Sequence, residues 1–211
     1  MPEFVDLRVV EFVRKTAATE DPVLAVVKGT LEKQGLPSIT PEAGRFLQVL
    51  LRIMNAKRVC EIGTCLGYST IWMARALPDT GRLDTIEIDA KRAADAQKWI
   101  TAAGLDKKVA IHVGKATAVL PTLPTKTYDL VFIDADKEPM LEYLKHAVKL
   151  VRHGGVIVAD NAFWQGSVFS KRINIEGAPE VRAFVDAATS HPELDATILP
   201  LGDGLLVAHR R

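Results

Sequence analysis

The sequence predicts an α/β protein with a mostly parallel, seven-stranded sheet, an antiparallel hairpin at its C-terminal end, and helices on both faces. Beyond residue 57, short runs rich in β-branched residues alternate with stretches of helical periodicity, which is typical of βαβ units. These runs are predominantly apolar, as in parallel strands buried on both faces. A Gly202-Asp203-Gly204 turn separates the last two runs, and such a tight turn joins antiparallel neighbours.

The first 54 residues are predicted to form a helical cap that precedes the sheet. A first helix should cover most of residues 3–17. A second should begin at Pro22 with Asp21 as its N-cap, and a third should begin after Thr40. The side chains expected on the buried stripes of the second and third helices are Leu24, Val27, Leu31, Phe46, Leu47, Leu50, Ile53 and Met54.

Residues 55–211 are predicted to form a Rossmann-like core, so that residues 1–211 make one domain. Strands are expected over 58–62, 83–88, 109–113, 128–133, 155–160, 196–200 and 205–209. Helices are expected over 68–77, 90–103, 138–151 and 179–189.

Composition excludes several classes of protein. Apolar residues make up 48% of the 211 residues and charged residues 25%, which argues against intrinsic disorder. The net charge of +1 provides no global attraction to nucleic acid or to an anionic membrane. No apolar run approaches the ~20 residues that span a bilayer, and early charges such as Glu3 and Asp6 do not fit a signal peptide. We therefore expect a cytoplasmic protein whose Cys60 and Cys65 are free thiols.

A glycine-containing loop, EIGTCLGYST, follows the first predicted strand. It is not a P-loop, because Gly63 and Gly67 are too close together and Tyr68 stands where a phosphate-binding lysine is needed. It also lacks the GxGxxG pattern of dinucleotide sites. S-adenosylmethionine needs close backbone approach without a phosphate cradle. Glu87 at the end of the second strand suits its ribose hydroxyls, and Asp89, two residues later, is a competing candidate. Acidic residues there also occur in nicotinamide enzymes, so Glu87 alone does not distinguish the two.

Polar and charged side chains follow two further strands. The fourth strand runs into Asp134 and Lys137, and the fifth runs into Asp160 and Asn161. Because these strands are predicted neighbours, their carboxyl ends should bring the four side chains to one rim of the sheet. Three of them, Asp134, Asp160 and Asn161, carry hard oxygen ligands, and such a set beside one lysine suits Mg²⁺ or Ca²⁺.

Five stretches of the chain resemble one enzyme family. VCEIGTCLGYST, TIEID, YDLVFIDADK, GGVIVADNAFWQGSV and LPLGDGLLV are similar to the cation-dependent class I O-methyltransferases, which include caffeoyl-CoA and catechol O-methyltransferases. VFIDADK together with GGVIVADN separates this family from methyltransferases in general. The resemblance implies the class I methyltransferase fold, S-adenosylmethionine as co-substrate and a divalent cation (Mg²⁺, Mn²⁺ or Ca²⁺).

The resemblance also implies a role for individual residues. Glu87 would contact the ribose, Ala116 the adenine and Asp136 the methionine amino group, with Lys137 as general base and Asp134 as the second catalytic residue. The residues implied in donor binding are Glu61, Gly63, Ser69, Glu87, Ala116, Asp134 and Asp136. The residues implied in cation binding are Asp134, Asp160 and Asn161.

The resulting hypothesis is an O-methyltransferase acting on a small aromatic vicinal diol, and the resemblance implies a homodimer. A relative of this kind could instead methylate a tRNA base hydroxyl. A nicotinamide-dependent oxidoreductase and a non-catalytic binding module are weaker alternatives, because GxGxxG is absent and the Asp-Lys-Asp-Asn set is intact.

Overall fold

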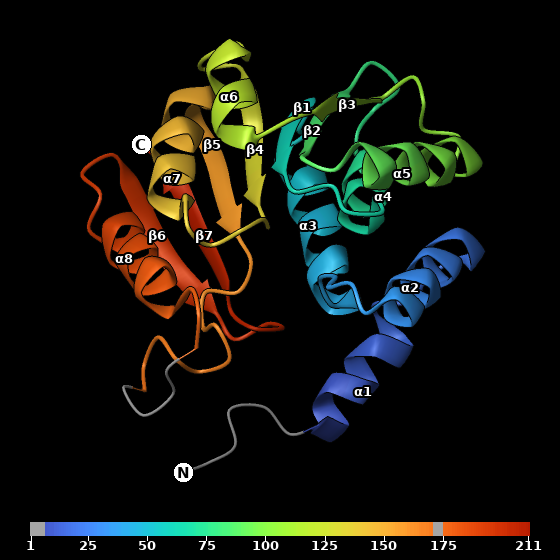
Figure 1. The fold of residues 1–211 in the computed structure, drawn as a ribbon, viewed down its shortest axis with the longest axis horizontal. Helices are drawn as coiled ribbons and strands as arrows, with labels where there is room; N and C mark the ends of the chain where they lie inside the picture. Colours follow the sequence, from blue (N-terminus) through green and yellow to red (C-terminus); the bar gives the residue numbers. More distant parts are fainter. Residues whose placement is uncertain (1–6, 171–174) are drawn as a thin grey trace.

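The computed structural model describes residues 7–170 and 175–211, and it confirms the predicted fold class (Figure 1). A seven-stranded sheet has the order β3-β2-β1-β4-β5-β7-β6, and β7 runs antiparallel to both β5 and β6. Its strands are β1 (Arg58–Ile62), β2 (Arg82–Glu87), β3 (Val109–Val113), β4 (Tyr128–Ile133), β5 (Val151–Ala159), β6 (Leu194–Leu199) and β7 (Leu205–Arg210). The strand order reverses between β1 and β4, which is where ligands bind in open α/β sheets.

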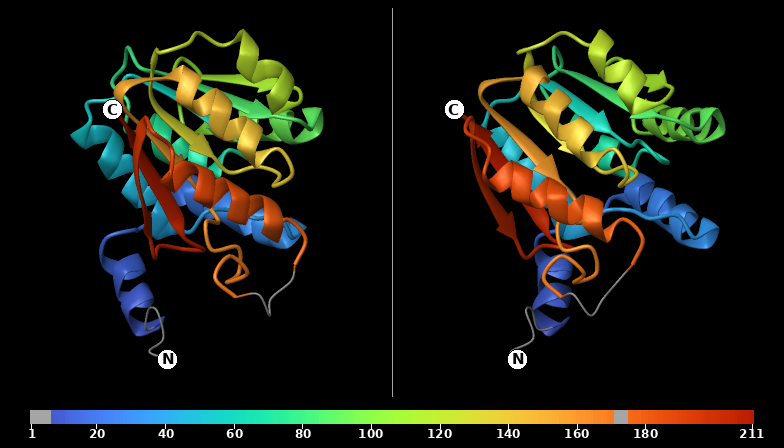
Figure 2. Two further views of the ribbon diagram at one scale, coloured as in Figure 1. Left: turned by 90° about the vertical axis from the view of Figure 1, so that its left-hand side faces the viewer. Right: turned by 60° about the vertical axis from the view of Figure 1, so that its left-hand side comes forward.

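Helices cover both faces of the sheet. On one face lie α3 (Pro41–Ile53), α4 (Tyr68–Ala74) and α5 (Ala90–Ala102), with α2 (Pro22–Gln34) packed on α4 and α5. On the other face lie α6 (Ala116–Val119), α7 (Met140–Leu150) and α8 (Ala178–Thr189), and Figure 2 shows α7 and α8 side by side in front of the sheet. In β4, Leu130 and Phe132 face the first group and Val131 and Ile133 the second. This double burial explains the continuous apolar strands.

The predicted helix starts are confirmed by their capping bonds. The Asp21 carboxylate accepts hydrogen bonds from Val23 N and Leu24 N, and the Thr40 hydroxyl accepts one from Ala43 N. The first helix, α1 (Leu7–Thr16), packs against α3, while residues 3–6 of its predicted span lie outside the described residues. In the described part of the chain, no helix combines the length and apolar character needed to span a membrane.

The predicted buried stripe of α3 is confirmed in part. Leu47 is fully buried, and Phe46, Leu50 and Met54 are partly buried and pack against the core, whereas Ile53 is 73% exposed. The helix also turns Ala43, Gly44 and Gln48 inward, because it packs closely against Trp72 of α4. A Cβ on Gly44 would lie 2.6 Å from the Trp72 ring, so a small residue is needed at this crossing.

Other differences concern element boundaries. The helix predicted over 138–151 ends at Leu150, because Val151 begins β5, and the pairing of β4 with β5 shifts register between Val151 and Val156. The helix predicted over 68–77 ends at Ala74, shortly before Pro78, a residue type that restricts the backbone ahead of it. Helix α6 and a 3₁₀ helix over Leu120–Thr122 were not predicted.

Candidate functional site

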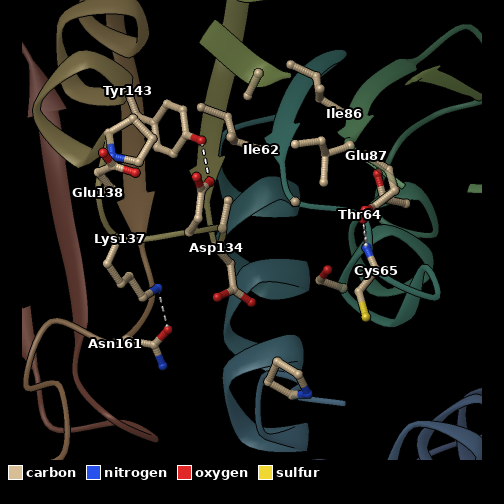
Figure 3. Close-up of a pocket in the computed structure, with 18 of the residues that line it drawn as sticks. Ile62, Thr64, Cys65, Ile86, Glu87, Asp134, Lys137, Glu138, Tyr143 and Asn161 are labelled. Atoms are coloured by element: carbon tan, nitrogen blue, oxygen red, sulfur yellow. Dashed lines mark hydrogen bonds between the residues drawn. The ribbon is translucent and has the colours of Figure 1, made fainter. Parts of the chain in front are cut away.

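A cavity of about 1450 Å³ opens at the carboxyl ends of the parallel strands (Figure 3). In this view Lys137 and Asn161 lie on one side, Glu87 and Cys65 on the other, and Asp134 between them. The predicted site residues that line the cavity are Gly63, Ser69, Glu87, Ala116, Asp134, Asp136, Lys137 and Asn161. Glu61 and Asp160 are buried beside it. The fold thus gathers strand ends that are far apart in the sequence.

Gly63, directly after β1, has φ +99° and lies against the backbone of β4. A Cβ there would sit 2.0 Å from the carbonyl oxygen of Asp134. The Gly63 and Thr64 amides both donate to the Ile86 carbonyl, at 3.0 and 3.2 Å. This position therefore accepts only glycine, and the loop passes close to the residues that follow β4.

Replacing Gly63 by alanine should destabilise the protein far more than the same change at Gly104. Both glycines have positive φ, but a Cβ at Gly104 meets nothing within 4 Å. We expect Gly104→Ala to cost about 1–2 kcal/mol from backbone strain alone, and Gly63→Ala at least about 3 kcal/mol because a backbone clash is added. Urea unfolding of both variants measures the difference, and equal losses would contradict the close approach.

Glu87 is fixed at the end of β2 by four donors from three residues. Its carboxylate accepts hydrogen bonds from Cys65 N at 2.8 Å, Asp89 N at 3.0 Å and Arg92 Nε at 3.0 Å, and it pairs with Arg92 Nη2 at 2.8 Å. The side chain is almost fully buried, yet it lines the cavity. A carboxylate held in this way presents a defined acceptor to a ligand and ties the loop after β1 to β2.

Glu61 lies behind the cavity wall. Its carboxylate accepts hydrogen bonds from the hydroxyls of Ser69 at 2.5 Å, Thr70 at 2.5 Å and Thr85 at 2.7 Å, and the side chain is completely buried. Burial raises the pKa of Glu61 to about 7. Ser69 lines the cavity, so Glu61 orients one hydroxyl of the cavity wall.

The raised pKa of Glu61 should make stability depend on pH. Between the ordinary value of 4.5 and about 7, the folded protein holds a proton that the unfolded chain has released. The free energy of unfolding should therefore fall as the pH rises through this window, by at most about 3 kcal/mol. Glu61→Gln removes this titration, whereas Glu32→Gln on the exposed side of α2 should not. Parallel stability curves for the wild type and Glu61→Gln from pH 4.5 to 8 would contradict it.

The carboxylates after β4 and β5 come together as predicted. Burial raises the pKa of Asp134, and burial together with the charge of Asp134 raises the pKa of Asp160 to about 7. Lys137 Nζ donates to Asn161 Oδ1 at 2.8 Å, and Asn161 Nδ2 lies 3.4 Å from Asp160 Oδ2. Asn161 has a left-handed backbone with φ +61°, a strained conformation of the kind found at functional sites.

Asp203, in the turn between β6 and β7, also lines the cavity and was missed by the sequence analysis. It accepts hydrogen bonds from Gln165 N at 2.9 and 3.1 Å, and burial raises its pKa. The signal was present, because β7 pairs antiparallel with β5 and this places the turn at the carboxyl end of β5. Trp164 lines the cavity as well, and its ring lies 5.1 Å from Lys137 Nζ.

The residues around Asp134 fit a hard divalent cation. Two carboxylates with raised pKa values and one amide oxygen form a donor set whose negative charge a cation would stabilise. In the described ranges, no group of three or more His, Cys, Asp or Glu side chains is arranged to hold a metal ion. The donor set at this rim consists of two aspartates and one asparagine. Its third oxygen ligand is therefore the amide oxygen of Asn161.

Comparison with known sequences identifies relatives over nearly the whole chain. The profile of a family described as O-methyltransferase matches residues 14–211. A catechol O-methyltransferase of Niastella koreensis is 45% identical over 190 residues, which cover 86% of this chain and 85% of the relative. A catechol O-methyltransferase of Mycobacterium tuberculosis is 39% identical, over 89% of this chain and 86% of the relative.

Solved structures give the same result. An O-methyltransferase from Streptomyces achromogenes that is involved in tomaymycin synthesis, solved with S-adenosylmethionine, aligns with a TM-score of 0.88 and 35% identity over 96% of both chains. An O-methyltransferase from Bacillus cereus, solved with S-adenosylhomocysteine, aligns with a TM-score of 0.87 and 33% identity over 97% of both chains.

Proposed function

The chain belongs to the O-methyltransferase family, and we propose that it transfers a methyl group from S-adenosylmethionine to one hydroxyl of a small aromatic vicinal diol, with help from a divalent cation. The observation that carries the proposal is the convergence of Asp134, Asp160 and Asn161 beside Lys137 at the cavity. The catechol activity in the names of two relatives supports an acceptor with adjacent hydroxyls.

The methyl donor is proposed to lie across the ends of β1 and β2. Gly63 would allow its methionine part to approach the backbone, and Glu87 would accept hydrogen bonds from the ribose hydroxyls. Ser69, Ala116 and Asp136 line the same cavity and are the remaining candidates for donor contacts. Solved relatives that contain S-adenosylmethionine or S-adenosylhomocysteine support this choice of ligand.

The acceptor is proposed to bind where Asp134, Asp160 and Asn161 could hold a cation. A bound divalent cation would supply a positive charge that favours ionisation of an acceptor hydroxyl and would fix two vicinal oxygens. The chain itself would contribute the proton acceptor, Lys137 Nζ, which already lies at the rim of the cavity. Trp164, whose ring faces this lysine, would exclude water from one side of the acceptor.

The test is a mass-spectrometric screen of vicinal diphenols for the gain of one methyl group in the presence of S-adenosylmethionine and Mg²⁺. Matched monophenols serve as the control, because they have one hydroxyl and cannot use both oxygens. Methylation of monophenols at the same rate would contradict a vicinal-diol mechanism. S-adenosylhomocysteine should also raise the melting temperature whereas NAD(H) should not, and the reverse would favour the oxidoreductase alternative.

A tRNA acceptor is less well supported than a small molecule. Lys107 and Lys108 precede β3, at the amino ends of the parallel strands and so opposite the cavity. Arg210 is buried and donates to the carbonyls of Val148 and Val151, and Arg211 pairs with Asp195. A further basic pair, Lys171-Arg172, lies outside the described residues.

The homodimer and the cytoplasmic location stay predictions. Helix α1 exposes Val9 by 53% and Phe12 by 66%, and an apolar surface of this kind suits a second copy of the chain. Light scattering at micromolar concentration measures the assembly directly, and a monomeric mass would contradict the dimer.

A further inference from the structure

Tyr143 and Asp136 form a hydrogen-bonded pair in the cavity wall. The Tyr143 hydroxyl, on the first turn of α7, donates to Asp136 Oδ1 at 2.5 Å (Figure 3). Tyr143 is only 3% exposed, whereas Asp136 is exposed and lies in the loop between β4 and α7. Both residues line the cavity. The buried Tyr143 phenol therefore holds the side chain of Asp136, an exposed loop residue, in one orientation.

The partner of Asp136 in this pair is a neutral phenol rather than a cation. Burial and the bond to Asp136 raise the pKa of Tyr143, so the phenol remains a neutral donor. A lysine or arginine at this place would orient the carboxylate but would also neutralise it. The single phenol proton occupies one oxygen, which leaves the other oxygen of Asp136 available to an N–H group of a ligand. In contrast, the carboxylate of Glu87 is held by several donors, including Arg92.

We propose that Tyr143 is a positioning residue that fixes Asp136 as the acceptor for an amino group of the methyl donor. This inference rests on the proposed function, because it assumes that S-adenosylmethionine occupies the cavity. The donor carries two amino groups, one on its amino-acid tail and one on its adenine, and either has the N–H chemistry that an oriented carboxylate recognises.

Three ligands distinguish the two amino groups by isothermal titration calorimetry. S-adenosylhomocysteine has both, methylthioadenosine lacks the amino-acid tail, and S-inosylhomocysteine lacks the adenine amine. Tyr143→Phe should weaken S-adenosylhomocysteine by about tenfold, the scale of one hydrogen bond to a charged group. The affinity should stay unchanged for the analogue that lacks the amino group bound by Asp136. Selective sparing of methylthioadenosine supports the tail, and selective sparing of S-inosylhomocysteine supports the adenine.

Tyr128→Phe is the matched control. Its hydroxyl donates to Asp84 Oδ2 at 2.9 Å, and it too is a buried tyrosine bonded to an aspartate, but it begins β4 and does not line the cavity. This variant should bind all three ligands as the wild type does. An equal loss for all three ligands in Tyr143→Phe would overturn the proposal, because a general structural defect has no preference among them. Unchanged binding of S-adenosylhomocysteine would overturn it too.

Asp136→Asn provides a second route that does not disturb the core. It should spare the same analogue as Tyr143→Phe, and adding Tyr143→Phe to it should cause no further loss, because the two residues act as one unit. Additive losses of affinity in the double variant would contradict the pair. If Tyr143→Phe does not fold, wild-type affinities in Asp136→Asn would overturn the proposal. A wild-type protein that binds no S-adenosylhomocysteine would refute the proposed function itself, which is a different outcome.

Discussion

Chelation of divalent cations by EDTA should abolish methylation of a catechol by this protein, and Mg²⁺ or Mn²⁺ should restore it. The physical reason is the donor set of Asp134, Asp160 and Asn161, which consists of oxygens suited to hard cations. Without a cation, an acceptor hydroxyl loses the charge that favours its ionisation and the contact that orients both oxygens. The measurement is the initial rate of product formation with and without EDTA, followed by titration of each metal.

A variant of the proposed ligand set, compared with a control variant outside the cavity, tests the same mechanism without a chelator. Asp160→Ala removes one buried carboxylate and should lose most activity at ordinary metal concentrations, with partial recovery in excess metal. Asp195→Ala, at the surface of β6, removes a carboxylate outside the cavity and should retain the metal dependence of the wild type. Undiminished methylation in EDTA would show that the proposed cation-assisted mechanism is wrong.

Lys137→Ala should lower kcat by roughly 10²-fold or more near neutral pH, the usual scale for the loss of a general base. Its Nζ is the amine that the loop after β4 brings to the cavity, 2.8 Å from Asn161 Oδ1. Affinities for S-adenosylhomocysteine and for the metal should be retained, because other residues are proposed to bind these ligands. Part of the lost rate should return at higher pH, where the acceptor hydroxyl ionises without help. Steady-state kinetics from pH 6 to 10 tests both expectations.

Lys149→Ala is the matched control. Lys149 lies on α7, the helix that follows the loop of Lys137, but it is exposed and outside the cavity. It should keep the wild-type kcat and pH profile. If Lys137→Ala retained wild-type kcat at neutral pH, Lys137 would not be the base. If instead it lost the affinity for the donor or the metal, its role would be binding.

The sequence predicted best the parts of the site that depend on strand ends. Asp134 and Asp160 follow two apolar runs, and parallel neighbouring strands necessarily bring their carboxyl ends to one edge. Gly63 was predictable for a similar reason, because a glycine directly after the first strand of such a sheet indicates close backbone approach. Local patterns were sufficient here, since each residue's place follows from the element that it ends.

Other contacts needed information that no local pattern contains. Tyr143 and Asp136 are seven residues apart, but their bond depends on how α7 packs against the sheet. Asp203 was interpreted only as a turn residue, although the hairpin brings it beside Asn161. The resemblance implies donor binding for Glu61, and the structure directs its side chain to hydroxyls of α4 and β2 behind the cavity wall.

By itself, therefore, the sequence determined the order of strands and helices, the capping residues Asp21 and Thr40, and the strand-end oxygens, because hydrophobic periodicity and backbone propensity act over a few residues. The tertiary structure alone decided that α3 buries Ala43, Gly44 and Gln48 and exposes Ile53, and which hydroxyls Glu61 meets. It also decided that Asp203 reaches the cavity. These outcomes depend on side-chain volumes at helix crossings, such as Gly44 against Trp72, and on the register of β7 along β5. Both are set by contacts between residues distant in the chain.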